Sequence, residues 1–252
     1  MIVSQGNNFC RDASLTPTAS GDLINTNPLL APLGNYGGTT QTHALLPGSP
    51  AINAGTSSGA PTTDQRGISR VGTTDIGSFE SRGFSMVSSS GNNQSATVNT
   101  AFANPLVVTV SSTNSEPVSG GVVTFTGPGS GASINPASLT ASIAGTTASR
   151  SVTANATAGG AYNVAATTKG ASATVNCSLT ITVVPPSFTT NPTTKAVCTG
   201  NGTTFTVAAS GSPTYQWQVD AGSGFTNLSN SGVYSGATDA TLTISNVAGL
   251  NG

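Results

Sequence analysis

Strict alternation of apolar and polar residues is the feature that most limits what this chain can fold into. In VNCSLTITV, residues 175–183, a single polar residue separates each apolar residue from the next. Successive side chains of a β-strand point to opposite faces of a sheet, so this period of two places all the apolar residues on one face. The same pattern recurs in LVVTV, VVTFT and AYNVAA. The residues predicted to face inward are Leu106, Val108, Val110, Val123, Phe125, Tyr162, Val164, Ala166, Val175, Cys177, Leu179, Ile181 and Val183.

Composition supports an all-β chain and excludes several functions. Charged residues make up only 6% of the chain, against about 25% in an average soluble domain. Seven basic residues form no patch that could neutralise a run of phosphates, so nucleic-acid binding is excluded. No run of eighteen apolar residues is present, so we expect no membrane insertion within this segment. The start, MIVSQGNNFCRDAS, does not resemble a signal peptide, which leaves a cytoplasmic chain or a missing true start.

Changes in sequence texture divide the chain into three predicted domains. Residues 1–82 are irregular and rich in turn residues, whereas residues 83–184 alternate short strands with turns. A second break falls at Pro185-Pro186, because two prolines cannot donate to a strand ladder. About 100 residues of short strands without helices fit a two-sheet sandwich, so 83–184 is predicted to be one complete β-sandwich.

The last domain, residues 185–252, carries the pattern of a truncated immunoglobulin-type sandwich. Val207 lies ten residues before Trp217, which suits a core residue of strand B followed by the tryptophan of strand C. ATLTISNV fits strand E, with Leu242 and Ile244 facing inward. The strands that would follow are absent before Gly252, so we expect a fragment in which the inner face of Trp217 is partly uncovered.

Three stretches resemble modules of bacterial surface proteins. NPLLAPLGNYGGTTQTHALLPGSPAINAG, residues 27–55, with TDQRGISR and DIGSFE after it, resembles the C-terminal end of right-handed β-helix repeat proteins of the choice-of-anchor Q and CSLREA-motif type. This copy has Asn27 and Asn53 where the usual form has Asp. SGNNQSATVNTAFANPLVVTV, GGVVTFTGPGSGASI and ASRSVTANATAGGAYNVAAT resemble the Ig-like modules of invasin-like proteins, and residues 185–252 resemble Ig-like modules of large secreted bacterial proteins.

The resemblance implies the fold class: the terminal rung and cap of a right-handed parallel β-helix, then one complete and one truncated Ig-like β-sandwich. The last rung of a solenoid exposes an apolar face and a free edge unless a cap covers them. A remaining rung is expected around VSQGNNFC, residues 3–10. Prolines at 28, 32, 47 and 50 would stop the ladder. The residues expected to cover the open end are Leu29, Leu30, Leu33, Leu45, Leu46 and Ile52.

The charged residues between positions 64 and 82 are the densest group that could carry chemistry. They are Asp64, Arg66, Arg70, Asp75, Glu80 and Arg82. Two carboxylates could catalyse glycoside hydrolysis or bind Ca²⁺, and whether Asp64 and Asp75 bind calcium stays open. Because arginines separate the acids, we favour a network of salt bridges that holds an irregular loop.

The single histidine and the three cysteines are interpreted as structural. His43 has no second histidine or cysteine near it in the sequence, so a surface turn is favoured over a metal site or a catalytic base. Cys177 is predicted to be a buried thiol and Cys198 to precede strand B. With Cys10 in another segment, no disulfide within the chain is expected, and any partner of Cys198 would lie beyond Gly252.

The predicted function is that of a non-catalytic structural and adhesion segment of a large bacterial surface or secreted protein, in which Ig-like spacers project a β-helical module. The alternative is the noncatalytic C-terminal part of a carbohydrate-active β-helix enzyme such as a polysaccharide lyase. No catalytic, cofactor-binding or metal-binding residue is predicted in either case. The resemblance implies an extracellular or cell-surface location, with host or environmental glycans or surface proteins as partners.

Overall fold

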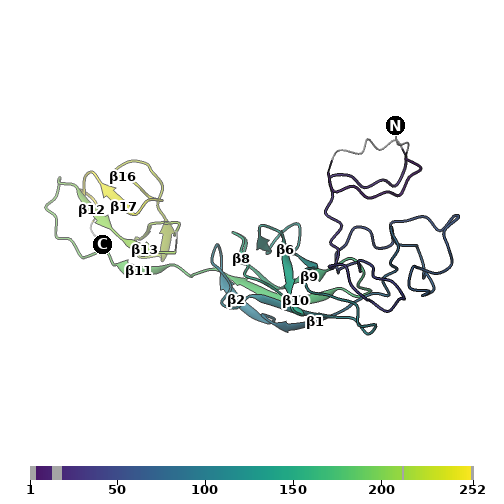
Figure 1. The fold of residues 1–252 in the computed structure, drawn as a ribbon. Helices are drawn as coiled ribbons and strands as arrows, with labels where there is room; N and C mark the ends of the chain where they lie inside the picture. Colours follow the sequence, from purple (N-terminus) through teal and green to yellow (C-terminus); the bar gives the residue numbers. More distant parts are fainter. Residues whose placement is uncertain (1–3, 13–18, 212, 251–252) are drawn as a thin grey trace. The chain divides into compact units, whose positions relative to one another are not determined.

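The chain folds into two compact units, residues 1–182 and residues 183–252. A computed structural model describes residues 4–12, 19–211 and 213–250. These residues form seventeen strands and no helix (Figure 1), so the all-β prediction is confirmed. The described part of the chain therefore holds no helix with the length and hydrophobicity that a membrane crossing requires.

The first unit is built on one eight-stranded sheet. The order of its strands is β1-β3-β7-β6-β4-β9-β10-β2. Their bounds are β1 Ser85–Ser90, β2 Gln94–Thr97, β3 Leu106–Ser111, β4 Val122–Thr126, β6 Ser138–Ala144, β7 Thr147–Arg150, β9 Gly159–Thr167 and β10 Val175–Thr182. Two short strands, β5 (Ile134–Asn135) and β8 (Thr153–Ala154), pair separately. All pairs in the large sheet are antiparallel except that of β2 with β10, which is parallel.

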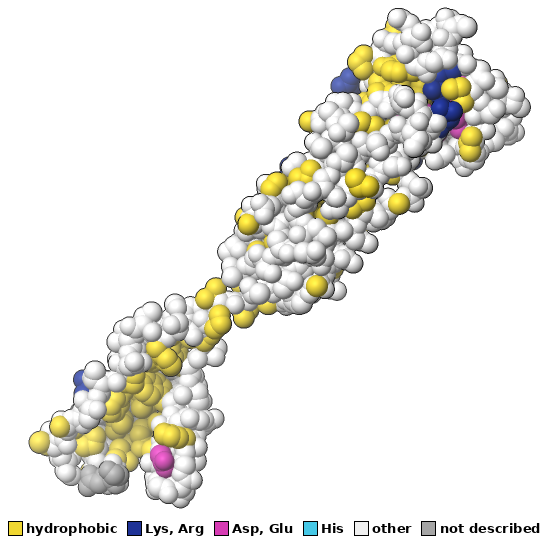
Figure 2. Space-filling view, turned by 90° about the horizontal axis from the view of Figure 1, so that it is seen from below, with side chains coloured by type: hydrophobic (Ala, Val, Ile, Leu, Met, Phe, Trp, Pro, Cys, Tyr) yellow, Lys and Arg dark blue, Asp and Glu magenta, His cyan; other side chains and the backbone are white. Residues whose placement is uncertain are grey.

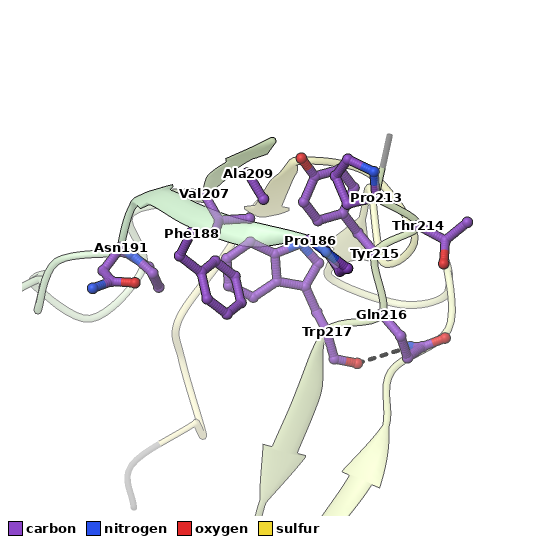
Figure 3. A pocket seen from close by; sticks show the side chains of 11 residues that line it. Pro186, Phe188, Asn191, Val207, Ala209, Pro213, Thr214, Tyr215, Gln216 and Trp217 are labelled. Atoms are coloured by element: carbon purple, nitrogen blue, oxygen red, sulfur yellow. Dashed lines mark hydrogen bonds between the residues drawn. The ribbon is translucent and has the colours of Figure 1, made fainter. Parts of the chain in front are cut away.

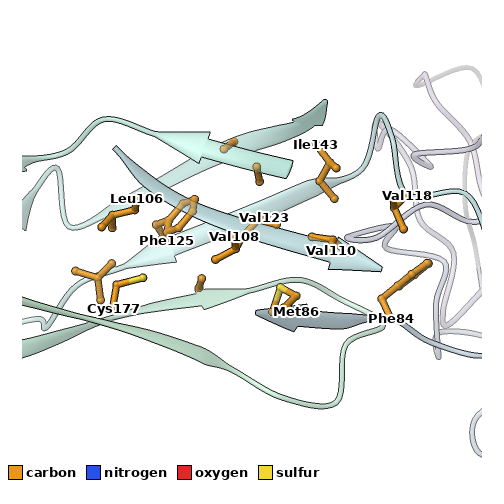
Figure 4. Close-up of a cluster of buried hydrophobic side chains, with 14 of the residues drawn as sticks. Phe84, Met86, Leu106, Val108, Val110, Val118, Val123, Phe125, Ile143 and Cys177 are labelled. Carbon is orange, nitrogen blue, oxygen red and sulfur yellow. The ribbon is translucent and has the colours of Figure 1, made fainter. Parts of the chain in front are cut away.

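The sheet folds over on itself because β6 belongs to both halves. Residues 138–142 of β6 pair with β4, and Ile143 and Ala144 pair with β7. Apolar side chains from both halves then point toward one another and form the core (Figure 4). Strand β1 also approaches strand β10, since the Ser88 hydroxyl lies 3.9 Å from the Cys177 sulfur.

The predicted inward faces are confirmed for most positions. Ten of the predicted residues are buried: Leu106, Val108, Val110, Val123, Phe125, Val164, Ala166, Cys177, Leu179 and Ile181. Tyr162 and Val175 are half-buried and pack against the core. The prediction for Val183 is wrong, because this side chain is 59% exposed. Strand β10 ends at Thr182, before the two prolines, so Val183 has no sheet face on which to lie.

The turn-rich segment, residues 19–82, packs on the sheet and shares its core. The cluster of buried residues that contains Val123 and Phe125 also contains Leu45, Leu46 and Ile52. The backbone of the turn-rich segment at Pro47 lies close to the backbone of the sheet at Gly121, which leaves no room for a side chain there. A methyl group added at Gly121 would lie 2.7 Å from the backbone oxygen of Pro47. Of the leucines expected to cover an open end, Leu29 is half-buried, while Leu30 and Leu33 are 40% and 56% exposed.

A parallel bridge joins Phe9 to Leu23 at the start of the first unit. Two backbone hydrogen bonds accompany this bridge: Cys10 N–H donates to the Leu23 oxygen, and Leu23 N–H donates to the Asn8 oxygen, both at 2.8 Å. The predicted rung around residues 3–10 includes the Asn8 and Cys10 atoms of these bonds, whereas Leu23 lies beyond it and Val3 lies outside the described residues. The chain therefore returns beside itself in parallel after 14 residues.

The second unit consists of three small sheets. Their strands are β11 Ser187–Thr190, β12 Thr203–Thr206, β13 Ala208–Ser210, β14 Gln218–Asp220, β15 Phe225–Asn227, β16 Tyr234–Ser235 and β17 Thr241–Ile244. The sheet orders are β11-β13, β12-β17-β16 and β14-β15. Val207 and Leu242 are buried as predicted, whereas Trp217 and Ile244 are half-buried.

Candidate functional site

The charged residues between positions 64 and 82 come together in the turn-rich segment, where no regular ladder is present. An antiparallel bridge between Thr63 and Ser69 turns the chain back on itself and places Asp64 inside the turn. Asp64, Asp75 and Glu80 are buried, with exposures of 6%, 3% and 1%. Carboxylates this deep in a protein need strong hydrogen-bond or ionic partners, and their partners show what the cluster can do.

Asp64 is paired with Arg66. Nη2 and Nε of Arg66 donate to Oδ2 of Asp64 at 2.7 and 2.9 Å, and both side chains are almost fully buried. The backbone N–H groups of Arg66 and Ile68 donate to Oδ1, and that of Glu80 donates to Oδ2. Burial opposes ionisation of Asp64, but these hydrogen bonds outweigh it and hold its pKa below the ordinary value. The guanidinium carbon of Arg66 also lies 3.5 Å from the centre of the Phe79 ring.

Glu80 forms a second ion pair with Arg70. Nη1 of Arg70 donates to Oε2 of Glu80 at 2.8 Å, and Nη2 donates to the Gly77 oxygen at 3.0 Å. The backbone N–H of Asp75 donates to the same carboxylate oxygen, and that of Val71 donates to the other. This pair therefore ties together both ends of the loop from position 70 to position 80.

Asp75 and Glu116 accept hydrogen bonds from backbone N–H groups and a hydroxyl rather than from arginine side chains. The N–H groups of Asn53 and Ser81 donate to the two oxygens of Asp75, each at 2.6 Å. Desolvation by burial nevertheless raises the pKa of Asp75 to about 6. Glu116 accepts from the Ser81 hydroxyl and the Arg82 N–H at 2.9 Å, and burial raises its pKa as well. Glu116 lies in the connection between strands β3 and β4 of the large sheet, so it fixes the end of the turn-rich segment to that sheet.

The geometry of this cluster suits a structural role better than a chemical one. Each oxygen of Asp64, Asp75 and Glu80 already accepts a hydrogen bond from the chain itself. Among the residues that the structure describes, no three His, Cys, Asp or Glu side chains are grouped as a metal ion would require. Arg82, the sixth residue singled out from the sequence, is exposed. Sequence reasoning missed Glu116, since an isolated acid in SEPVSG carries no local signal.

His43 lies on the surface of the turn-rich segment. Its Nδ1 is 2.8 Å from the backbone oxygen of Ala31, to which the protonated nitrogen donates. The side chain borders a cavity of about 390 Å³ whose lining is mostly apolar and includes Phe9, Leu30, Leu33 and Leu45. The other polar side chains in the lining are the amides and hydroxyls of Gln41, Thr42, Gln65 and Ser78, so no charged side chain among the described residues lines this cavity beside the ring.

The cysteines lie in three separate environments. Cys177 is buried in the core of the large sheet, and burial raises the pKa of its thiol. Cys198 is exposed in the second unit, and Cys10 lies near the parallel bridge, with its sulfur 3.2 Å from an oxygen of Asp12. The described residues contain no disulfide between Cys177 and Cys198.

Comparisons with known proteins give little further information. No protein-family model matches the chain, and no curated protein matches its sequence. Among solved structures, a chimeric titin Z1Z2-Z1Z2 tandem functionalized with a GRGDS peptide from fibronectin aligns over 66% of this chain and 83% of its own length. Its sequence identity is 18% and its TM-score is 0.24, which is too low to indicate a shared fold.

Proposed function

We propose that this chain is a non-catalytic structural segment of a larger bacterial surface or secreted protein, in which Ig-like sandwiches carry the end of a β-helical module. The observation that carries the proposal is that the buried carboxylates are bonded to groups of the chain itself. Asp64, Asp75, Glu80 and Glu116 are all engaged by groups of this chain, and together they attach an irregular segment to the large sheet. Such an arrangement supports a rigid junction rather than a reaction centre.

The β-helical part of the proposal is supported by the parallel bridge between Phe9 and Leu23. Parallel pairing of a chain with itself at short sequence separation is the geometry of stacked solenoid rungs. The exposed side chains of Leu30 and Leu33 border the same apolar cavity as Phe9, which is where a preceding rung would place its core residues.

The Ig-like part is supported by the order in which strands pair. In the second unit β11 pairs with β13, β12 with β17 and β17 with β16. When β12 and β13, which only Val207 separates, are counted together as strand B, these pairs follow the order A-B-E-D of an immunoglobulin sheet. The pair of β14 and β15 corresponds to strands of the opposite sheet. Phe205 of β12 lies 6.4 Å from Trp217, between ring centres, as expected for residues on facing sheets.

The parallel pair of β2 and β10 supports a load-bearing role. Residues 94–97 pair with residues 179–182, and the N–H groups of Asn93 and Val98 extend the ladder by donating to the Ser178 and Thr182 oxygens. Since β2 is near the start of the sheet in sequence and β10 ends it, tension between the two termini loads these hydrogen bonds together instead of one after another.

Stretching the chain from its two ends in a force experiment tests this role. The first unit is expected to resist extension, and Ala96→Pro is expected to lower its unfolding force. Val98 N–H donates to the Thr182 oxygen, and alternate residues of a parallel strand donate to the same neighbour, so the N–H of Ala96, opposite Ile181, faces β10 and proline cannot replace it. The matched control is Ser90→Pro, at the exposed end of the antiparallel edge strand β1, which should leave the force unchanged. Equal forces for all three proteins, or cleavage of a polysaccharide by the chain, would contradict the proposal.

A further inference from the structure

The turn-rich segment meets tension through bonds arranged differently from those between β2 and β10. Residues 29–46 form an antiparallel hairpin. Its outermost bond runs from the Leu46 N–H to the Leu29 oxygen at 2.9 Å, and its innermost bridge joins Gly34 to Thr42. The chain therefore enters and leaves the hairpin at the same end. Tension between the termini of the chain opens such a hairpin one bond at a time, starting from that end.

Behind the hairpin, a small set of contacts fixes the chain to the large sheet. The Gly48 N–H donates to the Lys169 oxygen and the Val122 N–H donates to the Pro47 oxygen, both at 2.9 Å. The ammonium group of Lys169 donates to the Pro50 oxygen at 2.7 Å. These contacts, called the junction below, carry the tension directly into the sheet. The rest of the turn-rich segment is shielded from tension until the junction breaks.

The remainder of the segment, residues 51–82, is also held so that it can be peeled. Its first residues lie against residues 74–76: the Ile76 N–H donates to the Ala51 oxygen at 3.0 Å, and the Gly55 N–H donates to the Thr74 oxygen at 2.8 Å. Its last residues are held by Glu116, which accepts from the backbone and from a hydroxyl. Once the junction breaks, tension enters beside the first pair of residues and loads these bonds in turn.

We propose that the turn-rich segment is a force buffer, in which residues 29–82 peel from the sheet and extend at low force while the sandwich, residues 85–182, stays folded. The buffer rests on the load-bearing role proposed above. In the pair of β2 and β10, tension is shared along residues 94–97 and 179–182, whereas each bond of the segment bears it alone. A bond that bears the whole load breaks at a lower force than one that shares it.

The charged side chains of the segment provide a way back when tension falls. On the face shown in Figure 2, Lys and Arg side chains gather at the end of the first unit that carries the segment. Asp64 pairs with Arg66, two residues away, and Arg70 pairs with Glu80, ten residues away. Closing such short loops costs little chain entropy, so both ion pairs can form again before the segment returns to the sheet.

Peeling of the segment and unfolding of the sandwich release different lengths of chain. A fully extended chain spans about 3.5 Å per residue, so residues 29–82 release about 190 Å and residues 85–182 about 340 Å. The distance that each folded part already spans lowers both values by a small amount. The two events can therefore be told apart by length alone.

The test is force spectroscopy on the full chain, held at its N-terminus and at a thiol introduced by Val184→Cys. Val184 is 54% exposed, and Cys10→Ser and Cys198→Ser remove the competing thiols. This attachment leaves the second unit outside the load path. The core of that unit is open, since Phe188 and Trp217 border a groove of about 360 Å³ (Figure 3), so its own unfolding would overlap the steps of interest.

The expected record is an extension of about 190 Å at low force, in one or more steps, followed by a single step of about 340 Å at higher force. Relaxing the chain after the first extension alone should restore it in the next pull. A single combined step, or unfolding of the sandwich before the segment, would overturn the proposal. So would a first extension that never returns while the sandwich is still folded.

Three variants assign the two events. Lys169→Met removes the ammonium group that bonds to Pro50 and keeps the apolar stem, so it should lower the force of the first extension alone. Ala96→Pro should lower the force of the second step alone. The matched control is Arg150→Met, an exposed cation at the end of β7, which should change neither force.

The two proposals can fail separately in this experiment. A first extension unaffected by Lys169→Met, or lowered by Ala96→Pro, would contradict the buffer. A second step unaffected by Ala96→Pro would contradict the load-bearing role of β2 and β10, even if the segment still peels first.

Discussion

Substitution of Asp64 by asparagine tests whether the buried ion pair stabilises the first unit. The change removes the charge that faces Arg66, whose side chain is 3% exposed, and leaves an unpaired cation in the interior. Breaking a buried pair from one side costs about 3 to 5 kcal/mol. The guanidinium keeps its bond to the Glu80 oxygen and its contact with Phe79, which favours the lower end, about 3 kcal/mol. For a unit of this size the melting temperature should fall by about 6 to 12 °C.

The assay is thermal unfolding at pH 7, followed by circular dichroism or calorimetry, with Arg82→Gln as the matched control. Arg82 is an exposed charge in the same stretch, so its loss should change the free energy of unfolding by less than about 0.5 kcal/mol. The double variant Asp64→Asn with Arg66→Met should be less destabilised than the sum of the single changes, since no lone charge remains. A loss for Asp64→Asn no larger than that of the control, or strict additivity, would refute the reasoning.

Four further outcomes are expected. Because burial raises the pKa of Asp75 to about 6 from 3.8, the contribution of this group to stability is fully present below pH 3.8 and is lost as the pH rises through 6. Asp75 alone should thus withdraw about 2 kcal/mol of stability between pH 4 and pH 7, and Asp75→Asn should remove that part of the pH dependence in denaturant unfolding. Gly121→Ala should destabilise the first unit by about 1 to 3 kcal/mol, since the new methyl group would lie 2.7 Å from a backbone oxygen, whereas Gly129→Ala, in open space, should be neutral. A thiol reagent should label Cys198 within seconds to minutes in the native chain and Cys177 only after unfolding, as mass spectrometry of the peptides can show. Calcium chloride at millimolar concentration should leave the melting temperature unchanged, and an increase would support a calcium site in the acidic cluster.

The sheet of the first unit could be predicted from sequence because its signal is local and repeated. A period of two, read at Leu106, Val108 and Val110, depends only on the strand geometry of consecutive residues, so burial follows directly from the sequence. The failure at Val183 has the same origin. The alternation continues through this residue, but the two prolines that follow end the strand one position earlier.

The attachment of the turn-rich segment to the sheet could not be predicted, because it depends on contacts between residues far apart in the sequence. Gly121 approaches Pro47, and Lys169 Nζ donates to the Pro50 oxygen at 2.7 Å. Neither contact leaves a pattern in its own stretch of sequence. The division into three domains with a boundary near residue 82 stays a prediction. Buried residues on both sides of this boundary share one core, but a shared core does not tell whether each side can fold without the other.

The clustering of charge in a chain with so few charged residues has a physical explanation in the backbone. In the large sheet, each strand satisfies its N–H groups on the neighbouring strand, and hydroxyl side chains are sufficient on the outer face. The turn-rich segment has no such ladder, so its buried N–H groups need other acceptors. Asp64, Asp75, Glu80 and Glu116 supply them, and they accept from the N–H groups of residues 53, 66, 68, 71, 75, 80, 81 and 82. Carboxylates are the strongest acceptors among side chains, and Arg66 and Arg70 form ion pairs with two of them, Asp64 and Glu80. Acidic residues therefore concentrate where regular pairing ends, for a reason that requires neither a metal ion nor a substrate.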